Sequence, residues 1–164
     1  MKGFRFIYLL FLVPGTIQAQ CEIINRIFPD QTMYYYIEPE LFFQNSKSKL
    51  RGNIITDKNN YFLQLLPEPF PPKEEKIKLS KKLKVKLAQD SLIELEFFDQ
   101  RYRRTDSSLA LMYLIPNKLL AAFSEKEIEW VDLDMNEEKG PRHYQFVLHK
   151  AALREQLNCL MNLK

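Results

Sequence analysis

Two stretches of this sequence carry side chains that could bind a ligand. One is a run of three tyrosines, in which Tyr34 and Tyr36 would share one face of a strand. The other is a run with three arginines and a tyrosine, the most concentrated positive stretch of the chain. Tyrosine rings stack on sugars or pack on a protein partner, whereas guanidinium groups bind phosphates and carboxylates. The candidate binding surface therefore comprises Tyr34, Tyr36, Arg101, Tyr102, Arg103 and Arg104.

Both stretches also have an ordinary structural explanation. The tyrosine face could be covered by another segment of the chain, and the arginines could lie in a solvated surface loop. These explanations are the commoner ones for such residues. The binding surface is therefore a hypothesis, and it depends on where the fold places these side chains.

The two histidines form no catalytic or metal-binding pattern. His143 and His149 stand at either end of one expected strand, which separates them by about 20 Å. They cannot share a metal ion at that distance, and the sequence places no serine or acidic residue beside either. We therefore expect ordinary surface histidines, and no catalytic residue, cofactor or metal.

Two further charged runs have ordinary explanations. The run from Asp132 to Asn136 begins like a calcium loop, but Glu137 stands where the loop needs glycine and His143 where it needs glutamate. The seven lysines between positions 73 and 86 are interrupted by two glutamates and fit the solvated face of a strand. We expect neither run to be a binding site.

The first nineteen residues have the layout of a cleaved secretory signal peptide. Lys2 and Arg5 precede an apolar run at positions 6–13, and Ala19 offers a small residue for cleavage. The run is too short to span a bilayer, and its Gln-Ala-Gln ending is similar to bacterial secretory signals. We expect a bacterial protein, cut after Ala19 and then secreted or periplasmic, with no transmembrane span in the mature chain.

The only two cysteines, Cys21 and Cys159, lie at opposite ends of the expected mature chain. An oxidising compartment favours a disulfide between them, which would close almost the whole chain into one loop. Two free buried thiols are one alternative. A lipid anchor on Cys21 is the other, and it is disfavoured because Gln20 stands where a lipoprotein signal has a small residue.

The mature chain, residues 20–164, has the length of one ordinary domain. The full sequence has 24 lysines and arginines and 21 acidic residues, and removal of Lys2 and Arg5 leaves 22 against 21, a net charge of +1. A chain so close to neutral has no general attraction for nucleic acid. The oligomeric state does not follow from the sequence.

Alternating apolar and polar residues predict an antiparallel sheet. Prolines at positions 67–72 predict an extended crossing segment. Within the hairpin at 82–98, a register with Val85 opposite Leu95 would place Lys84 opposite Glu96 and join the strands by a loop at 89–91. The strands are expected at 33–37, 50–55, 61–66, 82–98, 109–115, 131–135 and 144–148.

Two helices are expected beside these strands. Asn117 would cap a short helix at about 117–123. Leucines at positions 153, 157 and 160 predict a C-terminal helix from about Lys150, which would bring Cys159 to the first strand region. The fold class is thus α+β: antiparallel β-sheet in meanders and hairpins, packed by a C-terminal helix, in a single exported domain.

The function that these features favour is non-enzymatic binding, with an unknown extracytoplasmic protein or glycan as the partner, in the periplasm or at the cell surface. An enzyme needs positioned acid, base or nucleophilic groups, and the sequence supplies none in a recognisable pattern. The alternative is a small secreted hydrolase that uses two carboxylates, for example on glycans. Two acids in one cleft would favour the hydrolase, and a tyrosine surface would favour binding.

Overall fold

The structure is a computed structural model that describes residues 21–28, 31–71, 79, 81–89, 91–103 and 108–163. The expected signal peptide, its cleavage point after Ala19, Pro72, half of the lysine-rich run and Arg104 lie outside these residues. Ten strands and two helices are present in the described part of the chain. They are β1 (Ile24–Ile27), β2 (Met33–Tyr36), β3 (Glu40–Gln44), β4 (Lys49–Thr56), β5 (Tyr61–Glu68), β6 (Leu83–Leu87), β7 (Ser91–Arg103), β8 (Ser108–Ile115), α1 (Asn117–Glu125), β9 (Ile128–Leu133), β10 (Arg142–Gln145) and α2 (Ala152–Met161).

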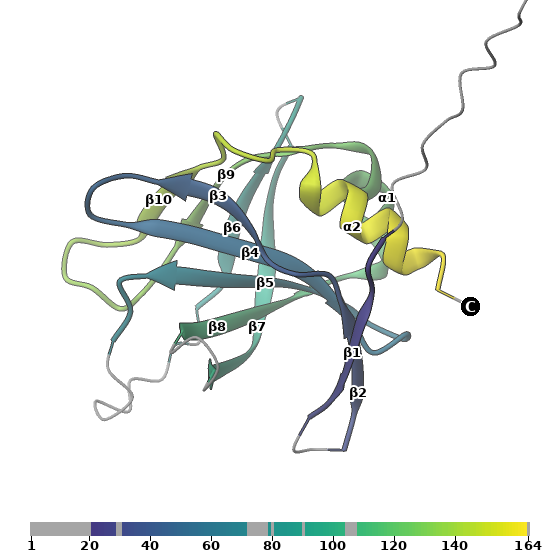
Figure 1. The fold of residues 1–164 in the computed structure, drawn as a ribbon. Coiled ribbons are helices and arrows are strands. Elements are labelled where there is room, and N and C mark those ends of the chain that lie inside the picture. Colours follow the sequence, from purple (N-terminus) through teal and green to yellow (C-terminus); the bar gives the residue numbers. More distant parts are fainter. Residues whose placement is uncertain are drawn as a thin grey trace, which may run out of the picture.

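The strands form one antiparallel sheet in the order β1-β2-β4-β5-β8-β7-β6-β9-β10, with β3 paired to β4 (Figure 1). The sheet curls until its far end returns to β3, where the backbone N–H groups of Val147 and Leu148 donate to the carbonyl of Phe42 at 3.0 and 3.1 Å. The Phe42 and Phe146 rings stack 4.5 Å apart at the same place. The α+β class and the antiparallel sheet are therefore as expected.

Alternation along the strands separates two apolar clusters. One face of the sheet, called here the inner face, carries the main core, which draws on all strands from β3 to β10 and on both helices. The other, outer face carries a smaller cluster of Tyr34, Ile55, Phe62 and Met112. On β4, for example, Ile54 belongs to the main core and Ile55 to the smaller cluster. A sheet that is apolar on both faces has to be covered on both.

The hairpin of β6 and β7 forms with the expected faces but not with the expected register. Val85 pairs with Ile93 instead of Leu95, and Lys84 pairs with Glu94 instead of Glu96. A shift by two residues keeps every side chain on its own face, so alternation does not distinguish the two registers. The backbone N–H of Ala88 donates to the carbonyl of Glu127, because β6 has a second partner in β9.

Two local expectations were wrong. Asn117 does not cap α1: the N-cap residue is Pro116, and no side chain caps this end. Pro67 was placed in the crossing segment, but it lies in β5 and pairs with Leu50. Proline fits there because β8 pairs with β5 only as far as Leu65, which leaves one edge of β5 without a ladder at Pro67.

The β1–β2 hairpin, called the arm here, joins the sheet by a short pairing. Only Tyr35 and Tyr36 pair with β4, opposite Thr56 and Ile55. The arm projects from the sheet in Figure 1, and the ring of Tyr34 lies 6.1 Å from that of Phe62 on β5. The arm therefore covers part of the outer face.

The side chain of Gln156 fills a gap in the strand pairing along one edge of β4, beside the arm. On this edge of β4, the pairing with β3 ends at Gly52 and the pairing with β2 begins at Ile55. In the gap, the backbone N–H of Ile54 donates to Oε1 of Gln156 at 2.9 Å, and Nε2 of Gln156 donates to the carbonyl of Glu38 at 3.2 Å. Gln156 on α2 thus completes the edge and holds the chain just after the arm.

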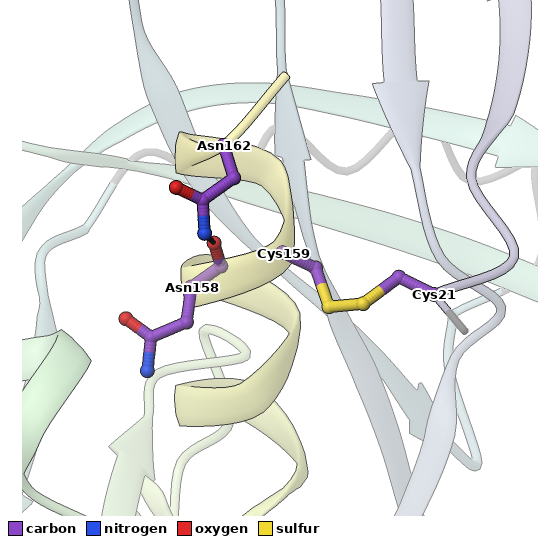
Figure 2. Close-up of a disulfide and its surroundings, with 4 residues drawn as sticks. All are labelled: Cys21, Asn158, Cys159 and Asn162. Carbon is purple, nitrogen blue, oxygen red and sulfur yellow. Dashed lines mark hydrogen bonds between the residues drawn. A yellow bond between two sulfur atoms is a disulfide. The ribbon is translucent and has the colours of Figure 1, made fainter. Parts of the chain in front are cut away.

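A disulfide holds the chain just before the arm. Cys21, three residues before β1, is bonded to Cys159 on α2 (Figure 2). The expected pairing of the two cysteines is present, and it joins positions 138 residues apart. One helix therefore holds both ends of the arm, through Cys159 and through Gln156.

Loss of the disulfide should lower stability strongly. We expect the double variant Cys21→Ser/Cys159→Ser to lose about 2–5 kcal/mol of unfolding free energy, because so long a closed loop restricts the unfolded chain. Urea unfolding of both proteins measures the difference, and reduction of the wild type should reproduce it. Equal midpoints for the oxidised wild type and the double variant would contradict a structural role for the bond.

Gln156 should matter more than its exposed neighbour. We expect Gln156→Leu to cost about 2 kcal/mol, because the buried Ile54 N–H would lose its acceptor. Asn158→Leu on the same helix is the matched control and should cost less than about 0.5 kcal/mol, since Asn158 is exposed and donates only to the carbonyl of Ser124. Hydrogen exchange of the Ile54 amide should accelerate in the first variant alone; unchanged exchange in both would show that Gln156 does not hold this edge.

Candidate functional site

A pocket of about 550 Å³ lies between the arm and the outer face of the sheet. The arm side supplies Arg26, Ile27, Phe28 and Tyr36. The sheet supplies Ile55 from β4, Gln64 from β5, Ala110 from β8, and Arg101, Tyr102 and Arg103 from β7. These residues converge because the order β2-β4-β5-β8-β7 places the arm and β7 on opposite sides of β5 and β8.

The two candidate surfaces of the sequence analysis meet in this pocket. Tyr36 lines it from the arm, and Arg101, Tyr102 and Arg103 line it from β7. Tyr102 also packs against the main core, and its hydroxyl donates to the carbonyl of Pro71 at 3.0 Å. Tyr34 is only 3% exposed and packs against Phe28 and Phe62, so its ring lies behind the wall. Arg104 lies outside the described residues.

The sequence analysis did not identify Arg26, Ile27, Phe28 and Gln64 as site residues. One signal was present, since the apolar and β-branched run before the tyrosines could have been interpreted as the partner strand of a hairpin. The position of Gln64 carried a second signal, a polar residue inside an apolar strand run. Neither signal shows that the hairpin lies over the outer face.

Arg101 joins the tip of the arm to the sheet. Its guanidinium carbon lies 4.2 Å from the centre of the Phe28 ring and 6.0 Å from that of Tyr34. On the sheet side, its Nε donates to Oδ2 of Asp99 at 2.5 Å. A cation over an aromatic face is attracted to the ring, by about 0.5–1 kcal/mol at partly exposed sites. Arg101 is thus both a wall of the pocket and a contact that holds the arm.

Three of the ten residues of the described chain that line the pocket, Arg26, Arg101 and Arg103, are cationic, and none of these ten is acidic. Asp99 offsets the charge of Arg101 from outside the lining. The rest of the wall is an amide, Gln64, together with aromatic and aliphatic side chains. This combination of a mainly apolar wall with a few polar groups is typical of small-molecule sites.

The histidines lie elsewhere, at the surface. The fold gives His143 on β10 an acidic neighbour that the sequence alone does not place there: its Nδ1 lies 2.7 Å from Oδ1 of Asp132, directly across on β9. The Trp130 ring lies 5.1 Å from the His143 ring. His149 lies 3.9 Å from Glu40, on the surface. Within the described ranges, no three potential metal ligands are grouped closely enough to hold an ion.

The acidic residues of the run that resembles a calcium loop, 132–136, contact other groups of the protein. Asp134 accepts hydrogen bonds from Nζ of Lys81 and from the backbone N–H of Asn136, both at 2.8 Å. Partial burial opposes ionisation of this carboxylate, but these bonds outweigh it, and the pKa of Asp134 is below its ordinary value. The carboxylate of Asp132 is paired with the His143 ring. Both carboxylates therefore serve the structure of this end of the sheet.

Glu137 and Arg142 tie the β9–β10 connection to the chain after β5. The guanidinium of Arg142 forms an ion pair with Glu137 and donates to the carbonyl of Pro69. The hydrogen bond from Arg142 lowers the pKa of Glu137 in spite of partial burial. The same bond raises the pKa of Arg142.

No family model matches the chain, and comparison with curated proteins and with solved structures also gives no match. Of the helices in the described part, none is long and apolar enough to cross a membrane. The functional argument therefore rests on the geometry of the pocket.

The Glu137–Arg142 pair should make a pH-dependent contribution to stability. A carboxyl whose pKa is lowered by folding stabilises the folded state above its ordinary pKa of 4.5, and this contribution is lost as the pH falls through the folded-state value. We expect Glu137→Gln to lower the unfolding free energy by roughly 0.5 kcal/mol at pH 7, a small amount because the side chain is 41% exposed.

The same difference should shrink as the pH falls through the folded-state pKa of Glu137, because protonation leaves both proteins with a neutral side chain at this position. Urea unfolding at pH 7 and at progressively lower pH measures it, and Glu138→Gln is the matched control for the loss of one negative charge. A difference that persists undiminished at the low pH would show that the charge of Glu137 is not its cause.

Proposed function

We propose that the protein is a non-enzymatic binding protein outside the cytosol, and that its ligand occupies the pocket beneath the arm. The observation that carries this proposal is the convergence of Tyr36 with Arg101, Tyr102 and Arg103. Tyr36 and the β7 residues were separate binding candidates in the sequence, where they lie more than sixty residues apart. A volume of about 550 Å³ is within the range of small-ligand sites.

The composition of the pocket favours binding over hydrolysis. A glycosidase needs two carboxyl groups that flank the scissile bond, and among the described residues that line the pocket none is acidic. Asp132 and His143 form a dyad, but they lie on β9 and β10, away from this pocket, and 57% of the His143 side chain is exposed. A dyad with so exposed a histidine does not exclude water from a substrate.

Export is part of the same proposal. A disulfide persists in an oxidising compartment, and the bond between Cys21 and Cys159 fits such a location. We place the signal peptide at residues 1–19, with cleavage after Ala19, and a bacterial periplasm or cell surface as the site of action. Residues 20–164 would then fold as one domain in which α2 packs on the sheet. Leu153, Leu157 and Leu160 support that packing, because all three belong to the main core.

Binding in the pocket can be tested with a neutral aromatic probe, N-phenyl-1-naphthylamine. We expect saturable binding, followed by fluorescence, with NMR shift changes at the amides of Tyr36, Gln64 and Ala110. Tyr36→Ala should weaken binding about fivefold, because an aromatic contact contributes about 1 kcal/mol.

Tyr35→Ala is the matched control, since Tyr35 lies on the same strand but packs against the main core. It should leave the affinity within twofold, once NMR shows that the variant is folded. Absent saturation, shift changes remote from the pocket, or equal losses in the two variants would each overturn the proposal.

A further inference from the structure

We propose that Gln64 selects the ligand, and that the ligand carries an amide whose N–H and carbonyl lie on the same side, as in a primary carboxamide or a lactam. This inference rests on the proposed function and adds the chemical class of the ligand and the residue that recognises it. It follows from the burial, the surroundings and the hydrogen bonding of one side chain.

Gln64 is a polar residue in an apolar part of the sheet. Its neighbours along β5, Leu63 and Leu65, both belong to the main core. The side chain of Gln64 therefore points to the outer face, where it lines the pocket. The residue is only 7% exposed. A largely buried carboxamide is thus presented at the wall of the pocket.

Within the described part of the chain, no group forms a hydrogen bond with the side-chain amide of Gln64. Directly across on β8 lies Met112, which is buried and offers only a thioether. Directly across on β4 lies Asn53. Its Nδ2 donates to the carbonyl of Ile37 at 2.7 Å, and its buried Oδ1 has no partner either. Since buried polar groups nearly always form hydrogen bonds, the partner of the Gln64 amide has to come from the pocket.

The chemistry of a carboxamide determines which ligand group satisfies it. Gln64 offers a donor, Nε2, and an acceptor, Oε1, side by side. A carboxylate would bond to the donor and turn its negative charge toward the acceptor, whereas an ammonium group would bond to the acceptor alone. An amide with its N–H and carbonyl on the same side matches both atoms with two parallel hydrogen bonds. A primary carboxamide and a lactam are two sources of such a group.

Two pairs of small neutral probes test this match, and the members of each pair differ in whether they have an N–H to donate. 2-Naphthamide is compared with 2-acetonaphthone, in which a methyl group replaces the NH₂ group, and 2-quinolinone is compared with 1-methyl-2-quinolinone. NMR titration of the wild-type protein measures the affinities. We expect the N–H probe of at least one pair to bind about fivefold more tightly than its partner and to shift the side-chain NH₂ resonances of Gln64. The pair with the larger ratio distinguishes a carboxamide from a lactam.

Gln64→Met assigns the preference to this side chain. Methionine has a similar shape and no amide, so the variant should bind both members of each pair equally. Its urea midpoint should equal or exceed that of the wild type, because the variant no longer buries an amide without a partner. Gln145→Met is the matched control and should keep the wild-type preference, since Gln145 is exposed on β10, outside the pocket lining.

The outcomes separate the two proposals. If neither pair binds, if both members of each pair bind equally, or if Gln64→Met keeps the preference, the ligand class fails, while binding of N-phenyl-1-naphthylamine keeps the pocket proposal. A lower urea midpoint for Gln64→Met would show that the amide is bonded within the protein, and would overturn its role in selecting the ligand. If N-phenyl-1-naphthylamine does not bind either, the proposed function fails together with the ligand class.

Discussion

The attachment of α2 to both ends of the arm is the constraint on which the pocket depends. Cys159 holds the chain before β1 through the disulfide, and Gln156 holds the chain after β2 through the carbonyl of Glu38. The arm itself shares only two residue pairs with β4, and an isolated two-stranded hairpin has marginal stability in water. The helix therefore supplies the restraint that the short ladder lacks, and it does so from the far end of the sequence.

The sequence predicted the faces of the strands well but not their partners. Alternation determines which side chains point inward, so the main core, the antiparallel sheet and the central position of β8 could be predicted. It does not determine the register: Val85 pairs with Ile93, two residues from the expected partner, and a shift by two residues leaves the alternation unchanged. Likewise, Asp132 and His143 become neighbours only through the pairing of β9 with β10.

The candidate site was predictable in parts and not as a whole. Residue type alone identified Tyr36 and the arginines of β7 as candidates, since aromatic rings and guanidinium groups are suited to binding as well as to structural contacts. Their convergence depends on the strand order, in which β8 lies between β5 and β7 although β6 and β7 precede it in the chain. Arg26 was missed because an exposed basic residue on a short strand has no periodic signature, and only the arm's position over the outer face gives it a neighbour in the pocket.

The pocket follows from a sheet that is apolar on both faces. The inner face carries the main core, to which both helices contribute residues, but Ile55, Phe62 and Met112 on the outer face still need cover. The arm covers the cluster around Tyr34 and reaches β7 where the rings of Phe28 and Tyr34 lie beside the guanidinium of Arg101. The pocket lies next to these contacts. A side chain that contacts the arm, Arg101, thus also lines the space in which a ligand would lie, so that occupation of the pocket and the position of the arm are coupled by one residue.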